Sequence, residues 1–127
     1  MRVERYTHKK HLPLLTKWLS HHGMSVPPLE YFSDTGLVVD GVVIGFLFLT
    51  NSGVAWVDNL AADPKCPVGR KREAVDRLVR ELEDIARFYG KSALTGIGNS
   101  FPTRLAFERN GFAPLRTGYT HYMKELG

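Results

Sequence analysis

A long amphipathic helix between two apolar strands is the feature that most constrains the fold of this chain. Residues 54–62, "VAWVDNLAA", predict one strand, and residues 92–99, "SALTGIGN", predict another made of small residues. Apolar residues between them recur at a spacing of three and four, which indicates a helix with one buried face. A strand, a helix and a strand in this order form a right-handed unit with parallel strands. The apolar stripe comprises Val75, Leu78, Val79, Leu82, Ile85, Ala86 and Tyr89, and Gly90 ends the helix.

The segments before this unit predict a strand, a helix and a hairpin. Residues 2–7, "RVERYT", alternate as a strand does, and a helical pattern runs from about His11 to Gly23. Pro13 fits in the first turn of that helix, where a missing N–H is tolerated. A proline-marked loop with room for one short helical turn follows. The two β-rich runs beside Asp40-Gly41 then predict a hairpin, since this dipeptide tolerates a type I′ turn.

The segments after the unit predict one more helix and one more strand. Residues 101–112, "FPTRLAFERNGF", indicate a short helix closed by Asn110-Gly111, and residues 119–126, "YTHYMKEL", indicate a last strand. The order β-α-β-β-β-α-β-α-β predicts an α/β (α+β) fold, a mixed β-sheet flanked by helices. A length of 127 residues with 43% hydrophobic residues favours one domain over residues 1–127.

The composition argues against several classes of function. The longest apolar run, "VVIGFLFL", is too short to span a bilayer, so no membrane association is expected. A single cysteine, Cys66, cannot form an internal disulfide, which favours a reducing cytoplasm. The net charge of +4 permits an anionic partner, but basic residues are interleaved with acids, which disfavours nucleic acid. His8 and His11 flank two lysines and have no further ligand set, so no metal site is predicted.

Two segments resemble the GNAT superfamily, the GCN5-related N-acetyltransferases. "VDNLAADP" before the long helix resembles the family's fourth strand and acetyl-CoA-binding loop, and "NSFPTRLAFERNGF" resembles its late helix. The resemblance covers nearly the whole chain. It implies an acetyl-CoA-dependent N-acetyltransferase that transfers an acetyl group directly to an amine of a small molecule or a protein, with acetyl-CoA as co-substrate. The family's loop glycines are missing, because Pro67, Arg70 and Arg72 occupy the three motif positions.

The long helix opens on three positive charges, at the end where its own dipole is already positive. In one interpretation these side chains and the first amides hold the phosphates of coenzyme A. In the other, the cationic turn is solvated and the site has decayed. The resemblance implies that strand four pairs with the pantetheine arm and that Asn99 touches it, although an asparagine there also suits a cap or a turn. The predicted cofactor-binding residues are Leu60, Ala61, Ala62, Val68, Gly69, Arg70, Lys71, Arg72, Asn99 and Phe107.

Three residues are predicted to act in catalysis: Asp58, Tyr119 and His121. Asp58 falls where many relatives carry an acidic general base, while the alternative is an Asp that ends a strand or pairs with an arginine. Phe107 stands where relatives often have a tyrosine that protonates the leaving thiolate, and it has no hydroxyl group. Water, Tyr119 or Tyr122 of the last strand, or an absence of catalysis are the alternatives. His121 lies on the same predicted strand, which borders the acceptor cleft in this fold.

Three functions are compatible with these patterns. The first is an N-acetyltransferase whose acceptor region is built from the first helix, the loop over residues 21–32 and the last strand. The second is a weakly active or inactive GNAT scaffold that binds a protein partner. Its small size resembles that of some bacteriophage-encoded proteins, which implies a host protein as the partner. The third is a basic nucleic-acid-binding domain, whose duplex affinity would fall steeply with salt. A monomer or a homodimer is expected.

Overall fold

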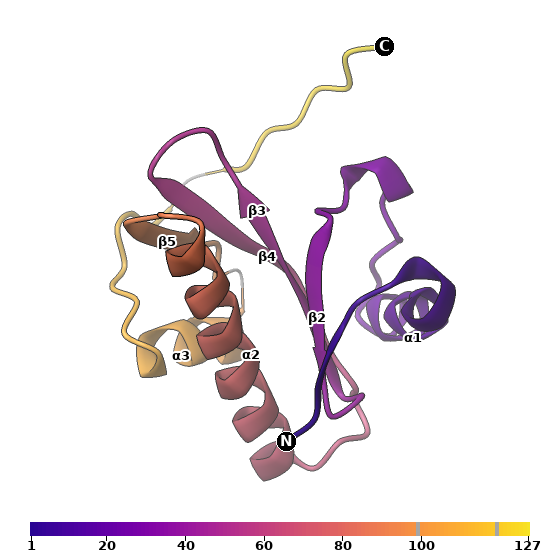
Figure 1. Ribbon diagram of the computed structural model, residues 1–127. Coiled ribbons are helices and arrows are strands. Elements are labelled where there is room, and N and C mark those ends of the chain that lie inside the picture. Colours follow the sequence, from indigo (N-terminus) through magenta and orange to yellow (C-terminus); the bar gives the residue numbers. More distant parts are fainter. Residues whose placement is uncertain (99, 119) are drawn as a thin grey trace.

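The computed structural model describes residues 1–98, 100–118 and 120–127 as one mixed sheet with helices on both faces (Figure 1). The strands lie in the order β1-β2-β3-β4-β5 across the sheet. Helix α1 covers one face, and helices α2 and α3 cover the other. The elements are β1 (Val3–Arg5), α1 (His8–His21), the 3-10 turn η1 (Leu29–Tyr31), β2 (Thr35–Val39), β3 (Val43–Leu49), β4 (Val54–Ala62), α2 (Val68–Phe88), β5 (Ala93–Gly96) and α3 (Phe101–Arg109).

The antiparallel half of the sheet confirms the predicted hairpin. Strands β2 and β3 pair from Thr35 opposite Leu47 to Val39 opposite Val43. Both turn residues have positive φ, 52° at Asp40 and 63° at Gly41, as a type I′ turn requires. Strand β3 then lies between β2 and β4 and is buried on both faces over most of its length, which explains its unbroken apolar sequence.

The sheet separates two layers of core, one against each set of helices. The core on one face of the sheet contains Val43 and Val57 of the sheet, packed with Leu78 and Leu82 of α2 and with Phe107 of α3. Leu15 and Trp18 of α1 pack with Ile44 and Phe46 on the other face, together with Tyr6 and Phe32. Because successive residues of a strand point to opposite faces, neighbours such as Val43 and Ile44 serve different layers.

Helix α2 begins earlier than predicted and ends one residue before Tyr89, the last residue of the predicted stripe. It begins at Val68, two residues before Arg70, because Pro67 precedes it with a backbone φ of −54° that suits a helix start. It ends at Phe88, and Gly90 follows with φ +76° as the predicted terminator. Tyr89 therefore lies beyond the helix and is 58% exposed, so its place in the buried stripe was wrongly predicted.

Helix α1 begins at His8, three residues before the predicted start. The Thr7 side chain caps it by accepting a hydrogen bond from the Lys10 N–H group at 3.3 Å. Pro13 consequently lies inside the helix and not in its first turn. Pro13 has no N–H group, so the carbonyl one turn earlier in the helix lacks its usual hydrogen-bond donor. This part of the helix is exposed, where water can take the place of that donor. The helix still ends where expected, with Gly23 at φ +71° just after its cap.

The predicted last strand is not formed. Residues 120–127 have no regular secondary structure and their side chains are exposed, while Tyr119 lies outside the described residues. Alternation stabilises a strand only when one face can be buried, and this segment buries neither. Within the described chain, β5 consequently pairs with β4 alone. No helix in the described parts of the chain is long and apolar enough to cross a membrane.

Candidate functional site

Strands β4 and β5 part halfway along β4. They pair in parallel over only four residues, from Val54 opposite Ala93 to Val57 opposite Gly96. Beyond Val57, β4 continues to Ala62 and pairs with β3 only. The backbone N–H and C=O groups of residues 58–62 that face away from β3 therefore have no strand beside them in the described structure. Such groups can hydrogen-bond an extended ligand as another strand would.

A bulge in β4 lies at the same place. The β3–β4 register shifts there, so that Asn59 and Leu60 stand opposite the single residue Gly45. Asn59 has φ +54°, a left-handed conformation that asparagine tolerates better than most residues. Gly45 makes room for the bulge, since a Cβ there would lie 2.5 Å from the Leu60 Cδ2 atom and 2.7 Å from the Leu78 Cδ2 atom. A larger residue at position 45 would require the Leu60 and Leu78 side chains to move.

The start of α2 is positively charged, and no acidic side chain of the described residues forms an ion pair with its basic residues. Lys71 is the first residue whose N–H bonds within the helix, to the Pro67 carbonyl at 2.9 Å, which leaves the N–H groups of residues 68–70 without helical acceptors. No side chain caps this end, and its first turn contains no acidic residue. Arg70 and Arg72 are exposed. Free amides, the helix dipole and basic side chains together favour an anion such as a phosphate.

The other predicted cofactor residues are divided between the two faces of the sheet. Leu60 and Ala62 pack toward the α2 layer, whereas Ala61 is buried in the α1 layer. Phe107 is buried, with its ring 4.7 Å from that of Phe112. Asn99 lies outside the described residues. The small side chains of Ala61 and Ala62 leave room for a ligand to approach the backbone of β4 closely.

The separation of β4 from β5 beyond Val57 leaves a gap beside residues 58–62 of β4. Phe107 closes the α2 side of this gap, next to the end of β5. A Cβ on Gly96 would lie 2.5 Å from the Phe107 Cζ atom, so the ring occupies the space that a side chain on β5 would need. It has no hydroxyl group and is surrounded by apolar neighbours. Phe107 can therefore pack at this position but cannot donate a proton.

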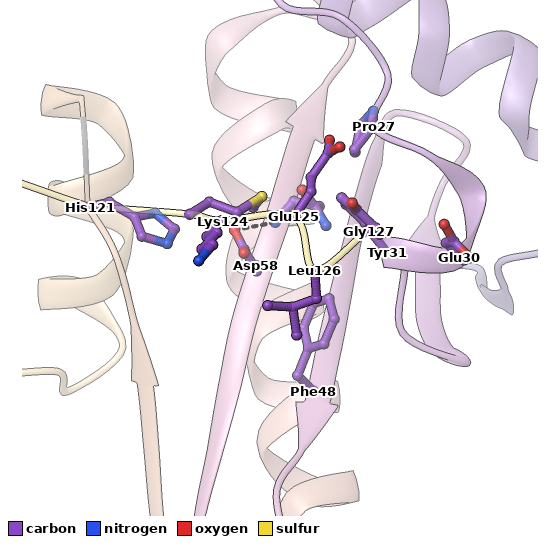
Figure 2. Close-up of a pocket in the computed structure, with 12 residues that line it drawn as sticks. Pro27, Glu30, Tyr31, Phe48, Asp58, His121, Lys124, Glu125, Leu126 and Gly127 are labelled. Carbon is purple, nitrogen blue, oxygen red and sulfur yellow. Dashed lines mark hydrogen bonds between the residues drawn. The ribbon is translucent and has the colours of Figure 1, made fainter.

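A cavity of about 860 Å³ lies on the α1 side of the sheet (Figure 2). It is lined by Asp58 and Asn59 of β4, by Phe48 of β3, by Pro27, and by Glu30 and Tyr31 of η1. The exposed C-terminal segment contributes His121 and residues 123–127 to its lining. The cavity therefore extends from the point where β4 separates from β5 to the loop that was predicted to form part of the acceptor region.

The cavity brings two of the predicted catalytic residues, Asp58 and His121, to its wall. Asp58 pairs across the strands with Phe46, which places it on the α1 face of the sheet. Its Oδ1 atom accepts the Asn59 N–H at 2.7 Å, and among the described residues it forms no ion pair. His121 is exposed at the mouth of the cavity. Tyr119 lies outside the described residues, and Tyr122 is 86% exposed.

Sequence reasoning missed part of the cavity wall. Phe48 lines it without having been singled out, whereas Lys124 and Glu125 belong to the C-terminal segment that was predicted to border the acceptor. Phe48 belongs to a strand that is apolar at every position, so its sequence gave no sign that one of these side chains borders a cavity. Phe32, at the end of the loop predicted to border the acceptor, is buried against the α1 core.

An ion pair fixes α3, and with it Phe107, against α2. The Asp76 carboxylate accepts hydrogen bonds from the Arg109 guanidinium at 2.8 Å and from the Asn110 amide at 3.0 Å. Partial burial raises the pKa of Asp76, but the bonds from Arg109 and Asn110 outweigh it, so the pKa lies below its ordinary value of 3.8. These contacts position the helix that borders the gap.

The histidines near the N-terminus, considered in the sequence as possible ligands, take part in local contacts. No group of three or more His, Cys, Asp or Glu side chains in the described parts of the chain is arranged to hold a metal ion. The Nδ1 atom of His11 accepts the Thr7 N–H at 3.0 Å, and the His8 Nδ1 atom lies 3.0 Å from the Tyr6 hydroxyl. Both histidines are thus engaged in local structure.

Comparison with known proteins identifies the fold. No family model and no curated protein sequence matches the chain. Among solved structures, a Trypanosoma brucei acetyltransferase matches with a TM-score of 0.69 at 16% identity, over 96% of this chain and 99% of that one. Glucosamine-6-phosphate N-acetyltransferase from Arabidopsis thaliana matches with a TM-score of 0.68 at 12% identity, over 97% and 98% of the two chains. A Mycobacterium tuberculosis protein solved in complex with CoA matches with a TM-score of 0.73 at 15% identity, over 95% and 76%.

These likenesses and the topology define a class: the chain is an α+β protein with the fold of the GNAT acetyltransferases. The fold that the sequence predicted is thereby confirmed. The order of the first eight predicted elements also agrees, and only the last strand departs from it.

Proposed function

We propose that the protein is an acetyl-CoA-dependent N-acetyltransferase that transfers an acetyl group directly to an amine. The parting of β4 from β5 is the observation that carries this proposal. It exposes strand backbone beside residues 58–62, and the pantetheine arm of coenzyme A contains two amides that can bond to such backbone. The anion-attracting start of α2 supplies a site for the phosphates.

The gap also supports a direct transfer between two substrates. The α2 start and the α2 core layer lie on one face of the sheet, whereas Asp58 and the cavity lie on the other. An acyl donor held in the gap would present its thioester to an amine in the cavity. The amine nitrogen attacks the carbonyl carbon, the C–N bond forms, and the C–S bond breaks. A backbone N–H of the unpaired β4 segment would hold the carbonyl oxygen as it gains charge.

Asp58 is our candidate for the general base. A free alkyl amine with a pKa of about 10.4 is protonated at neutral pH and must lose a proton before or during attack. The Asp58 carboxylate, directly or through a water molecule, would accept that proton. The leaving thiolate would take a proton from water, since Phe107 offers none. His121 stays a candidate for orienting the amine.

Calorimetric titration of the protein with acetyl-CoA at low salt tests the cofactor part of this proposal. We expect saturable binding, and we expect the paired substitution Arg70→Glu and Arg72→Glu to weaken it by at least about tenfold, because both charges would then repel phosphate. A matched pair on the other face, Lys9→Glu and Lys17→Glu, changes the net charge equally. Equal weakening in both pairs would show a general charge effect and would refute the phosphate assignment.

A protein-binding scaffold with weak or no turnover is the second candidate. Two observations favour it: the buried Phe107 lacks a hydroxyl group, and long basic side chains replace the loop glycines at the start of α2. Folded protein that binds no acetyl-CoA in the titration would support this candidate over the enzyme. An affinity pull-down from bacterial lysate that recovers no specific partner would then count against it.

A further inference from the structure

The lysine just before β5 holds the turn that connects β3 to β4. The Lys91 Nζ atom donates hydrogen bonds to the carbonyl oxygen of Thr50 at 2.6 Å and to that of Ser52 at 2.7 Å. No acidic side chain of the described residues forms an ion pair with Lys91. Its ammonium group is therefore bound by main-chain carbonyls of a distant segment, and hydrogen bonds from a charged donor are stronger than those between neutral groups.

Backbone hydrogen bonds join the same two segments. The Ser92 N–H donates to the Gly53 carbonyl at 2.8 Å, and the Ala93 N–H donates to the same oxygen at 3.2 Å. The ladder between β4 and β5 begins directly beside these bonds, with Val54 opposite Ala93. We call the contacts of residues 91–93 with residues 50–53 the Lys91 clamp. The clamp thus lies at the end of β5 where the two strands are paired.

The gap lies at the opposite end of β5 from the clamp. Strand β5 has four residues, and in the described chain it pairs with β4 alone. Its last residue, Gly96, packs against the Phe107 ring, and β4 continues past it without a partner on that side. A ladder of four residue pairs supplies few hydrogen bonds, so the contacts at its two ends contribute much to the orientation of β5.

We propose that Lys91 is a positioning residue for the acyl donor. By holding the start of β5 to the turn between β3 and β4, it sets the width of the gap in which the pantetheine arm binds. Lys91 acts through β5 and does not touch the ligand. This inference rests on the proposed function for the identity of the ligand. In that function the phosphates bind at the start of α2, so the clamp affects the arm and not the phosphates.

Two ligands separate the arm from the phosphates. Coenzyme A contains both, whereas adenosine 3′,5′-bisphosphate contains phosphates without the arm. The native protein and Lys91→Met, which removes the charge and keeps a long side chain, are titrated with each ligand at a temperature where both proteins are folded. We expect Lys91→Met to weaken coenzyme A binding at least about fivefold and to change bisphosphate binding less than about twofold. Equal affinities of the two proteins for coenzyme A would overturn the proposal.

Two further variants separate positioning from a loss of charge. Lys91→Arg keeps a positive charge with N–H donors and should recover part of the affinity for coenzyme A. Lys17→Met, on the exposed surface of α1, changes the net charge equally and should leave that affinity unchanged. An equal weakening in Lys17→Met and Lys91→Met would show a general charge effect and would overturn the proposal.

Amide hydrogen exchange tests the clamp without any ligand. We expect the N–H groups of residues 93–96 to exchange at least about tenfold faster in Lys91→Met, while those of β2, which lies away from the clamp, stay unchanged. Unchanged exchange in β5 would overturn the proposal. Failure of the folded native protein to bind coenzyme A would refute the proposed function, whereas native binding that Lys91→Met matches would refute this inference alone.

Discussion

At the scale of single residues, Asp58 and Phe107 border the gap between β4 and β5 from opposite faces of the sheet. Asp58 is exposed to the cavity, whereas Phe107 is buried in the core against Gly96. A proton acceptor is thus present on the acceptor side, and no proton donor faces the gap from position 107. In the proposed reaction, proton removal from the amine is therefore the step that a side chain can assist.

Substitution of Asp58 by asparagine tests its assignment as the general base. Asparagine keeps the shape of the side chain but cannot accept the amine proton. We expect kcat to fall by about 10² to 10⁴, the range typical of general acid–base catalysis, while the dissociation constant for acetyl-CoA changes less than about threefold. Glu108→Gln, an exposed substitution on α3, serves as the control. An unchanged kcat in Asp58→Asn would remove Asp58 as the base.

Substitution of Gly96 by alanine tests the close contact with Phe107. The new Cβ would lie 2.5 Å from the ring, so the native packing must shift. We expect a loss of about 1–3 kcal/mol in the free energy of unfolding, measured by urea denaturation. Adding Phe107→Leu, which shortens the side chain at that point, should recover part of the loss. Gly69→Ala, with no heavy atom within 4 Å of the new Cβ, should cost nothing.

At the scale of elements, the α2–α3 contact holds the boundary of the gap in place. Asp76 of α2 accepts hydrogen bonds from Arg109 and Asn110 at the end of α3, and these bonds hold its pKa below the ordinary value of 3.8. A carboxyl group whose folded pKa is lowered stabilises the fold above its unfolded pKa. That contribution is lost as the pH falls through the folded pKa.

The pH dependence of stability tests this contact. We expect Asp76→Asn to lower the free energy of unfolding by about 1–2 kcal/mol at pH 7, and the difference from the native protein to shrink as the pH falls below about 4. Urea denaturation at pH 7, 4 and 3 gives the comparison. Asp84→Asn removes an exposed pairing with Arg87 and should cost less than about 0.5 kcal/mol at any of these values. A constant difference for Asp76→Asn across this range would contradict the assignment.

The elements also show which features the sequence predicts well. Asp40-Gly41 predicted the hairpin because the turn chemistry is local, and the spacing of apolar residues predicted α2 because most of its stripe is buried. The helix starts were missed because both helices begin ahead of the periodic segment, α1 after the capping Thr7 and α2 after Pro67, whose side chain caps nothing. The strand at 119–126 was wrongly predicted because alternation alone does not show whether a neighbouring strand is in place.

The candidate site was less predictable than the fold, for a physical reason. Asp58 and His121 were predicted from a resemblance, and the structure places both at one cavity, where their roles stay a prediction. The parting of β4 and β5 and the bulge opposite Gly45 depend on strand register. Register arises from packing across the sheet, so hydrophobic periodicity along one strand does not specify it.

At the scale of the whole molecule, the sheet separates two regions of opposite charge. The start of α2 carries free amides and basic side chains, and the cavity beside Asp58 is lined by Glu30, Asp58 and Glu125, for which the described residues provide no ion pair. An anionic acyl donor and a cationic acceptor would thus be attracted to different regions and would not compete for one site. The net charge of +4 is therefore a poor guide to either ligand, because it averages over both regions.

The open segment of β4 has a consequence for the cost of binding. Its backbone is bulged opposite Gly45 with Asn59 in a left-handed conformation, and β5 stops pairing with it after Val57. In the described structure, no strand has to be displaced before a ligand can bond to the unpaired peptide groups of this segment. A ligand arm that bonds to them orders itself but reorganises little of the protein, so preorganisation leaves most of the binding free energy available for holding the reacting atoms together.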